Sequence, residues 1–286
     1  GRGSLFPSVN ANFSQTRQKN AFGGSKPAPP YSISTANVSV SQSVDLFGGS
    51  IRGIEGLTAQ KERTRFQREA AYLTLTANII SALVQTASFE AQINATQQIL
   101  DVQAQQLDVL RRQLDLGAIA EADVLSETTA VAQTRATLPP LQRALAQSRN
   151  ELLALVGRYP DETLPGGAFD LASIHLPDQL PVSLPSQIVA QRPDIRIAEE
   201  TLHNASAQIG VATAAMLPQI TLTGSLGSVA NPIDNLFSGG TGIWSIGASI
   251  LQPIFRGGTL LHERKGAIAA YDVATAQYRQ TVIGAF

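Results

Sequence analysis

The stretch that decides the fold changes its periodicity at a pair of glycines. Residues 36–51 read Ala36-Asn37-Val38-Ser39-Val40-Ser41-Gln42-Ser43-Val44-Asp45-Leu46-Phe47-Gly48-Gly49-Ser50-Ile51. Up to Leu46, apolar residues at most even positions alternate with small polar ones, which is typical of a strand with one apolar face. From Ser50 to Leu116 there is no proline and the pattern becomes helical. The stretch therefore predicts a strand that leads directly into a long helix.

The same arrangement occurs a second time, about 210 residues later along the chain. The matching anchors are Phe6-Pro7 with Leu217-Pro218, Gln42 with Gln252, and Gly48-Gly49-Ser50-Ile51 with Gly257-Gly258-Thr259-Leu260, at offsets of 211, 210 and 209 residues. Alternation also marks residues 5–16, 220–226 and 244–254. We therefore predict an internal duplication with one β-hairpin per copy, over residues 5–47 and 217–255.

Between the two hairpins the sequence is mainly helical. Apolar residues spaced by seven, a coiled-coil period, form two rows: Ile93, Leu100, Leu107 and Leu114, then Val124, Val131, Leu138, Leu145 and Leu152. Gly117 ends the first helix because it takes the left-handed conformation without a steric penalty. Pro139-Pro140 should kink or split the second helix. We expect a helical hairpin over residues 50–157, with a first helix of ~100 Å and a tip at 116–123.

The other segments complete a fold that is mainly α with β. Residues 158–184 are rich in proline and predict an irregular connector. A helix is expected over 185–215, running through Pro193, and residues 257–286 predict the start of a second long helix.

Composition argues against several classes of function. Charged residues make up only 15% of the 286 residues, against roughly 25% in a typical soluble domain. The net charge is −1 without any basic block, which disfavours nucleic-acid binding. Cysteine is absent and the three histidines are scattered, so we expect no enzyme activity, no metal site and no cofactor. No stretch approaches the ~20 apolar residues of a membrane-spanning helix.

The strands nevertheless suit a membrane. Their polar faces carry Ser, Thr and Asn rather than Lys and Glu, and aromatic residues lie near strand ends, as in interfacial girdles, at Phe6, Tyr31, Phe47, Trp244 and Phe255. Four strands cannot close a barrel in lipid without unpaired edges, whereas three copies would pool twelve. The alternation predicts two faces: Asn10, Asn12, Ser39, Ser41, Ser245 and Ser249 toward the lumen, and Val9, Ala11, Val38, Val40, Ile246 and Ile250 toward lipid.

Several motifs resemble those of a known family. The most specific block holds Leu184-Pro185-Ser186, Arg192-Pro193-Asp194-Ile195-Arg196, Ile209-Gly210-Val211-Ala212 and Leu217-Pro218-Gln219-Ile220-Thr221-Leu222-Thr223-Gly224. It resembles the signature of the outer-membrane factors of tripartite (RND-type) efflux pumps, in the NodT/OprM branch of the TolC-like superfamily. Residues 114–124 resemble the helical-hairpin tip of that family, and residues 252–258 resemble its second strand-to-helix junction. The resemblance covers essentially the whole chain.

The resemblance implies a passive homotrimeric duct in the outer membrane of a Gram-negative bacterium. A 12-stranded β-barrel would continue into a long α-helical barrel across the periplasm. The implied partners are a periplasmic membrane-fusion adaptor and an inner-membrane pump, which supplies the energy for export of drugs or other solutes. The family pattern also has an N-terminal segment, often with a lipidated cysteine, and a second helical hairpin, so we expect this chain to be a fragment.

The tip is the candidate for a specific contact. The resemblance implies that the adaptor meets Leu116, Gly117, Ala118, Ile119, Ala120, Glu121 and Asp123, and we expect residues 118–120 at an exposed apex. An ordinary helix–helix turn is the simpler alternative, because carboxylates at a helix start also serve as caps. For the whole chain the alternatives are a structural coiled-coil protein of the envelope and a periplasmic adaptor, although nothing in residues 158–184 resembles the lipoyl-like domain of an adaptor.

Overall fold

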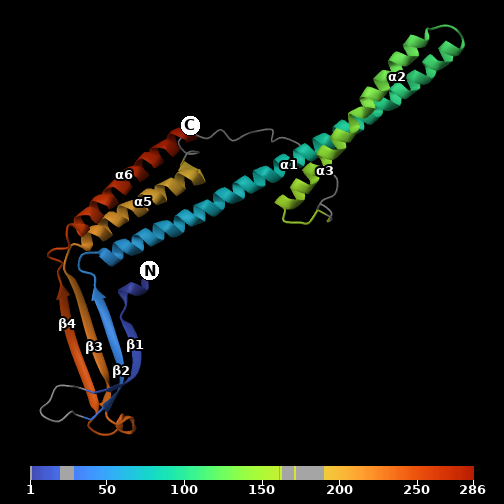
Figure 1. Ribbon diagram of the computed structural model, residues 1–286. Coiled ribbons are helices and arrows are strands. Elements are labelled where there is room, and N and C mark those ends of the chain that lie inside the picture. The colour runs from blue at the N-terminus through green and yellow to red at the C-terminus, as the bar shows by residue number, and fades with distance from the viewer. Residues whose placement is uncertain (1, 20–28, 161, 163–170, 172–189) are drawn as a thin grey trace. The chain divides into compact units, whose positions relative to one another are not determined.

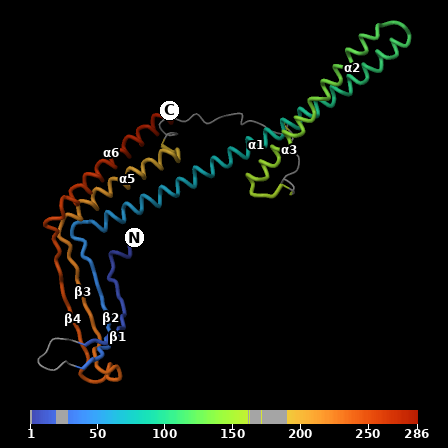
Figure 2. The backbone as a smooth tube through the Cα atoms, viewed as in Figure 1, coloured from blue at the N-terminus to red at the C-terminus, as the bar shows by residue number. Residues whose placement is uncertain are grey.

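The computed structural model describes residues 2–19, 29–160, 162, 171 and 190–286, and Figures 1 and 2 trace the chain. The chain divides into two compact units, one made of Gly1–Gln67 with Ser183–Phe286 and the other of Arg68–Val182. The expected connector at 158–184 lies mostly outside the described residues. Helix α1, Gly49–Asp115, is 67 residues long and contributes residues to both units.

The first unit contains a four-stranded antiparallel sheet in the order β1-β2-β3-β4. The strands are β1 (Ser8–Gln18), β2 (Tyr31–Val44), β3 (Gln219–Ala230) and β4 (Gly242–Leu251). The expected mixed fold with two hairpins is thus confirmed, and the hairpins pair with each other through β2 and β3. β2 begins five residues before the expected position because residues 31–35 also alternate and pair with the end of β1.

The two copies of the duplication share a hydrogen bond as well as a sequence. The side-chain amide of Gln42 donates to the backbone oxygens of Leu5 and Ser43, at 3.3 and 2.7 Å. The amide of Gln252 donates to those of Met216 and Pro253, at 3.2 and 3.1 Å. These acceptors lie 211 and 210 residues apart along the chain, the same offsets as the sequence anchors. Each glutamine therefore links the end of the second strand of its hairpin to the backbone just before the first strand.

Left-handed glycines mark each change from strand to helix, one at the first junction and two at the second. Gly48, after β2, has a φ of 75°, and Gly257 and Gly258, after β4, have φ values of 57° and 81°. Glycine adopts these values without the clash that a Cβ would cause. The chain can therefore turn from β2 into α1 and from β4 into α6 (Thr259–Ala285) within a few residues.

Three helical segments lie beside one another in the first unit: the start of α1, α5 (Pro193–Ala214) and α6. Small residues allow α1 and α5 to approach closely. A Cβ on Gly210 would lie 2.7 Å from Cγ of Arg52, and a Cβ on Gly56 would lie 3.1 Å from Nε2 of Gln208. Ala207 of α5 is fully buried. The sequence therefore selects residues without bulk where the two helices meet.

The prediction of one continuous helix running through Pro193 is wrong. In the structure α5 begins at Pro193, and Arg192 before it is extended, with φ −65° and ψ 129°. The proline ring disfavours a helical conformation in the preceding residue, while proline itself fits the first helical position. Residues 185–189 of the expected helix lie outside the described residues.

The second unit is a helical hairpin made by the later part of α1, α2 (Glu121–Ala136) and α3 (Leu138–Leu155). The returning helix is split in two at Thr137, as expected, and Pro139 and Pro140 occupy the first turn of α3. Every residue of the two predicted apolar rows is buried or half-buried, and Leu152 is 2% exposed. A buried hydrogen bond of 2.8 Å joins the hydroxyls of Thr86 in α1 and Ser148 in α3.

By length and composition alone, one described helix is apolar enough to cross a membrane, contrary to the expectation that no stretch would be. Helix α1 contains an 18-residue window with a mean hydropathy of 1.2. Residues 70–89 carry no charged side chain, but Thr and Ser interrupt their apolar residues. Because Thr86 within this stretch hydrogen-bonds to α3, we assign the stretch to the helical hairpin.

Candidate functional site

The strand pairing places all six residues predicted to face the lumen on one side of the sheet. Asn10 lies opposite Ser39, which is followed by Ser225 and Ser245 on β3 and β4. The neighbouring rows are Ser8-Ser41-Thr223-Gly247 and Asn12-Asn37-Gly227-Ile243, with Ser43-Thr221-Ser249 at the end next to the helices. The hydroxyls of Ser225 and Ser245 lie 2.8 Å apart and share a hydrogen bond. This side, called the polar face below, carries mostly small uncharged polar side chains, with Ile243 as an exception.

The polar face includes residues that the sequence prediction left out. Ser8, Asn37, Thr221, Thr223 and Ser225 belong to the same rows as the predicted residues. The alternation of each strand already puts these residues on the polar side, because residues two positions apart share a face.

The opposite side, called the apolar face, carries large hydrophobic residues that the chain leaves exposed. Its rows are Val9-Val40-Gly224-Ile246, Ala11-Val38-Leu226-Trp244 and, nearest the helices, Val44-Ile220-Ile250. Ile246 is 84% exposed, and Leu226, Trp244 and Ile250 are also open to solvent. A contiguous exposed apolar surface of this kind is typical of a face that contacts a membrane or another protein.

The predicted interfacial aromatic residues lie at both ends of the sheet, with one misplaced. Trp244 belongs to the apolar face, and Phe6, Phe47 and Phe255 are exposed next to the strand ends that adjoin the helices. Tyr31 instead lies on the polar side, where its hydroxyl accepts a hydrogen bond of 2.6 Å from Nε2 of Gln18. Tyr31 is at an odd position of β2, opposite in phase to Val38. Phe13, which the prediction omitted, is on the apolar face opposite Ala36.

The sheet has two free edges. In the described residues β1 pairs only with β2, and β4 pairs only with β3. An edge strand presents backbone N–H and C=O groups that can pair with another strand. The sheet can therefore be extended on both sides.

The hairpin tip has a well-defined backbone. The N–H of Gly117 donates to the carbonyl of Leu114 at 2.8 Å, and the N–H of Ala118 donates to that of Gln113 at 2.9 Å. With Gly117 at φ 73°, this pair of bonds is a Schellman motif. Helix α2 then starts at Glu121, where the carboxylate of Asp123 accepts the N–H of Ala120 at 3.3 Å.

The exposure of the tip differs from the prediction at one position. Leu116 is 83% exposed, and Gly117, Ala118, Ala120, Glu121 and Asp123 are exposed as well. Ile119, expected at the exposed apex, is half-buried. The two capped helix ends fold the short loop back, so Leu116, and not Ile119, presents the large apolar side chain to solvent.

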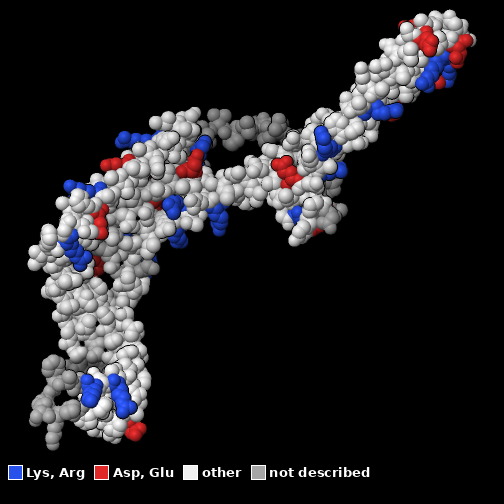
Figure 3. All heavy atoms as spheres, viewed as in Figure 1, with Lys and Arg blue, Asp and Glu red and all other residues white. Residues whose placement is uncertain are grey.

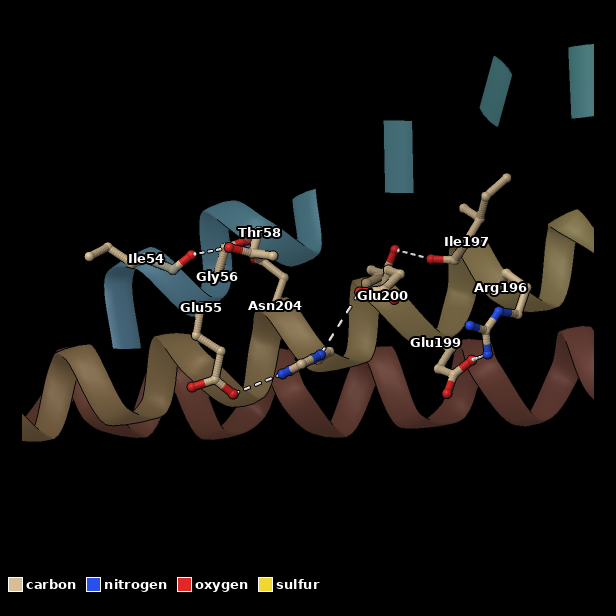
Figure 4. A network of polar contacts seen from close by, with 11 residues as sticks. Ile54, Glu55, Gly56, Thr58, Arg196, Ile197, Glu199, Glu200 and Asn204 are labelled. Carbon is tan, nitrogen blue, oxygen red and sulfur yellow. Dashed lines mark hydrogen bonds and ion pairs between the residues drawn. The ribbon is translucent and has the colours of Figure 1, made fainter. Parts of the chain in front are cut away.

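A polar network joins α1 to α5 in the first unit (Figure 4). Nε2 of His203 lies 2.8 Å from Oε1 of Glu55, and the side-chain amide of Asn204 donates to the backbone oxygen of Gly56 at 2.6 Å. Arg52 donates to Glu55 at 2.7 Å. The hydrogen bond with His203, and then that with Arg52, holds the pKa of Glu55 below its ordinary value. The sequence did not predict this contact of His203.

Little in the described part of the chain resembles a catalytic centre. Among those residues, no three His, Asp or Glu side chains gather as a metal site would require. The ion pairs Arg192–Asp194 and Arg196–Glu199 lie on the exposed surface of α5, and Arg196 also lies over the ring of Phe66 at 5.2 Å. The two ion pairs lie at or within α5, and only the contact with Phe66 links α5 to α1.

Comparisons with known proteins agree with the two-faced sheet and the helical hairpin. Residues 1–158 and 184–286 match the family described as outer membrane efflux protein, a family of efflux proteins and not of enzymes. The chain is 34% identical, over its whole length, to the probable efflux pump outer membrane protein TtgC of Pseudomonas putida. It is 27% identical, over 99% of its length, to the pyoverdine export outer membrane protein OpmQ of Pseudomonas aeruginosa. It covers 59% and 60% of these relatives.

A solved structure shares the same architecture. The open state of the outer membrane channel MtrE of Neisseria gonorrhoeae superposes with a TM-score of 0.87 at 29% identity, over 99% of this chain and 63% of that channel. The family and these relatives locate the protein in the outer membrane, with its helices on the periplasmic side. The chain therefore belongs to the outer membrane efflux protein family, as one of the TolC-like outer-membrane factors.

Proposed function

We propose that this chain forms part of the wall of a passive export duct in a tripartite efflux system. Three copies would contribute twelve strands to one β-barrel in the outer membrane. A periplasmic adaptor would engage the hairpin tip, and an inner-membrane pump would supply the energy. The observation that carries the proposal is the segregation of the sheet into a polar face and an apolar face, with both edge strands free.

The free edges support assembly from several copies. In a bilayer, unpaired backbone groups at a sheet edge each cost several kcal/mol, so a spanning sheet has to close on itself. Pairing of β1 in one copy with β4 in the next would satisfy both edges of every copy. Twelve strands would then enclose an aqueous passage, as an even number of antiparallel strands does in bacterial barrels.

The polar face supports a passage for varied solutes. Its rows contain hydroxyls and amides, such as Asn10, Ser39 and Ser245, and no charged residue. Such a wall stays hydrated but binds no particular ion strongly, so it would select its cargo weakly. Specificity would then belong to the pump, and the duct would need no catalytic group.

Substituted cysteines in the full-length protein test the face assignment, because this chain contributes no cysteine of its own. A cysteine at Ser39, in the centre of the polar face, should react with a membrane-impermeant thiol reagent and lower single-channel conductance in a planar bilayer. A cysteine at the adjacent Val40 should neither react nor change conductance. Equal reactivity at both positions, or full-length protein that forms no conducting pore, would refute the proposal.

A further inference from the structure

The two duplicated junctions between strand and helix use their charged residues differently. At the first junction, the carboxylate of Asp45 accepts a hydrogen bond of 2.9 Å from the N–H of Ile51 at the start of α1. The guanidinium of Arg52 pairs with the carboxylate of Glu55 at 2.7 Å. The charged groups of residues 43–56 therefore bind partners within the chain, and this segment has a net charge of −1.

The second junction, at residues 252–265, has the opposite charge. These residues correspond to 43–56 at the offset of 209, and they contain Arg256, Arg264 and Lys265 but only one acid, Glu263, which gives a net charge of +2. Arg256 is exposed, and within the described part of the chain no carboxylate pairs with it. Its guanidinium is therefore available to an anion from outside the chain.

Two large apolar side chains come directly before this cation. Ile254 is 95% exposed and Phe255 is 87% exposed, so both are more open than any residue of the apolar face. At the offset of 209 residues, Ile254 occupies the place of Asp45 in the first copy. Adjacent apolar side chains that the chain leaves open are typical of a surface that contacts a membrane or another protein.

The length of β4 indicates where this junction lies relative to a membrane. The strand has ten residues, which extend over ~33 Å. At the tilt of ~40° that strands adopt in membrane barrels, this length corresponds to about 25 Å, the height of their apolar band. Figure 3 shows only uncharged residues in the middle of the described sheet, and basic side chains over the helices that follow it. Residues 254–256 follow β4 at the helical end, which is the periplasmic end, so they would lie at the border of the hydrocarbon region.

We propose that the β4–α6 junction binds an anionic phospholipid of the periplasmic leaflet. Ile254 and Phe255 insert between its acyl chains, and Arg256 holds its phosphate group. This inference rests on the proposed function, since β4 must span the membrane for the junction to reach that leaflet. A guanidinium forms charge-assisted hydrogen bonds with phosphate oxygens. The first junction is unsuited to this role, because Asp45 repels a phosphate.

The first experiment tests the depth of the apolar pair in the full-length protein, reconstituted in vesicles of equimolar phosphatidylcholine and phosphatidylglycerol. A bimane fluorophore on a cysteine introduced by Ile254→Cys should be quenched strongly by phospholipids that carry a nitroxide on the acyl chain near the headgroup. The matched control is Arg279→Cys, an exposed position of α6 that lies ~30 Å from the start of the helix, and its label should not be quenched. Equal quenching at both positions, or none at position 254, would overturn the proposal.

The second experiment tests the charge, with native mass spectrometry of the same protein after extraction in mild detergent. Arg256→Gln should lower the preference of retained phosphatidylglycerol over phosphatidylcholine by about fivefold. Arg279→Gln removes the same charge far from the junction and should leave the preference unchanged. Equal effects of the two variants, no effect of Arg256→Gln, or displacement of the lipid by inorganic phosphate alone would refute the site.

Channel conductance of the same vesicles separates this inference from the proposed function. A conducting protein whose label at position 254 is not quenched refutes only the lipid contact. A protein that forms no conducting pore refutes the proposed function and the lipid contact with it.

Discussion

The sheet and the helical hairpin place their hydrophobic residues in opposite ways. In the hairpin, the rows that contain Val131 and Leu152 are buried or half-buried within the unit, although other large hydrophobic residues, such as Ile80 and Val102, are exposed. In the sheet, Ile246 and Ile250 are exposed and the hydroxyl-rich rows occupy the other face. The hairpin thus carries a core of its own, as a segment surrounded by water does. The sheet has no such core and depends on its surroundings to cover the apolar face.

The largest expected effect tests the core of the hairpin. Leu152→Ala should destabilise the helical unit by about 2–5 kcal/mol, because it leaves a cavity where a side chain is 2% exposed. Leu116→Ala, at 83% exposure, is the control and should change the midpoint temperature very little. Thermal unfolding of the full-length protein in detergent, followed by helical circular dichroism, measures both. Similar losses from the two variants would show that the hairpin has no separate core.

The second prediction exchanges the two faces of the sheet. Val40→Arg places a cation on the apolar face and should cost about 2–4 kcal/mol at mid-membrane depth, whereas Ser41→Arg on the polar face should cost much less. The yield of heat-resistant, SDS-stable oligomer in outer-membrane fractions should therefore fall for Val40→Arg and stay near normal for Ser41→Arg. If both variants assemble equally, the assignment of faces to lipid and lumen is wrong.

Sequence periodicity accounts well for both regions where each residue has one dominant constraint. Alternation predicts the face of Asn10 or Val38 because strand side chains repeat every two residues, and the seven-residue rows identify Leu107 and Leu152 for a similar reason. Alternation also places Tyr31 correctly, on the polar face with Ser39; the wrong prediction for Tyr31 came from its aromatic ring and its place near a strand end, which do not determine the face. The prediction for Ile119 was wrong because the exposure of a loop residue depends on how two helix caps fold the loop back, which periodicity does not describe.

The third prediction concerns the tip, where the hairpin exposes apolar residues as the sheet does. Ala118→Asp should abolish export while leaving oligomer assembly and membrane insertion intact, because a carboxylate is tolerated in water but is unpaired in an apolar interface. Ala118 is the better site than Gly117, since Gly117→Asp adds strain at a φ of 73°. The measurement is efflux in whole cells, together with crosslinking to the adaptor from a cysteine at position 118.

The control at the tip is Thr128→Asp, an exposed position further along α2, which should leave export unchanged. Normal efflux in Ala118→Asp would mean that the tip is only a turn between helices. In that case the exposed Leu116 would need no partner.

The smallest expected effect lies between the helices next to the sheet, where Glu55 meets His203. The folded state lowers the pKa of Glu55, chiefly through the hydrogen bond with His203. A carboxylate with a lowered pKa stabilises the folded state fully above its ordinary value of 4.5, and this contribution is lost as the pH falls through the lowered value. Because both side chains are partly exposed, the contribution is about 0.5 kcal/mol or less.

Glu55→Gln should therefore lower the midpoint of thermal unfolding slightly at pH 7, and the difference from the unaltered protein should shrink as the pH falls below 4.5. The amide of Asn204 still donates to the backbone of Gly56, so α1 and α5 should stay joined in the variant. Asn204→Ala is the matched comparison, because it removes a hydrogen bond without a titratable group and its effect should not change between pH 7 and pH 3. If the effect of Glu55→Gln on the midpoint is also the same at pH 7 and pH 3, the charge of Glu55 contributes nothing to stability. The contact between α1 and α5 would then depend on packing and uncharged hydrogen bonds, as the hairpin does.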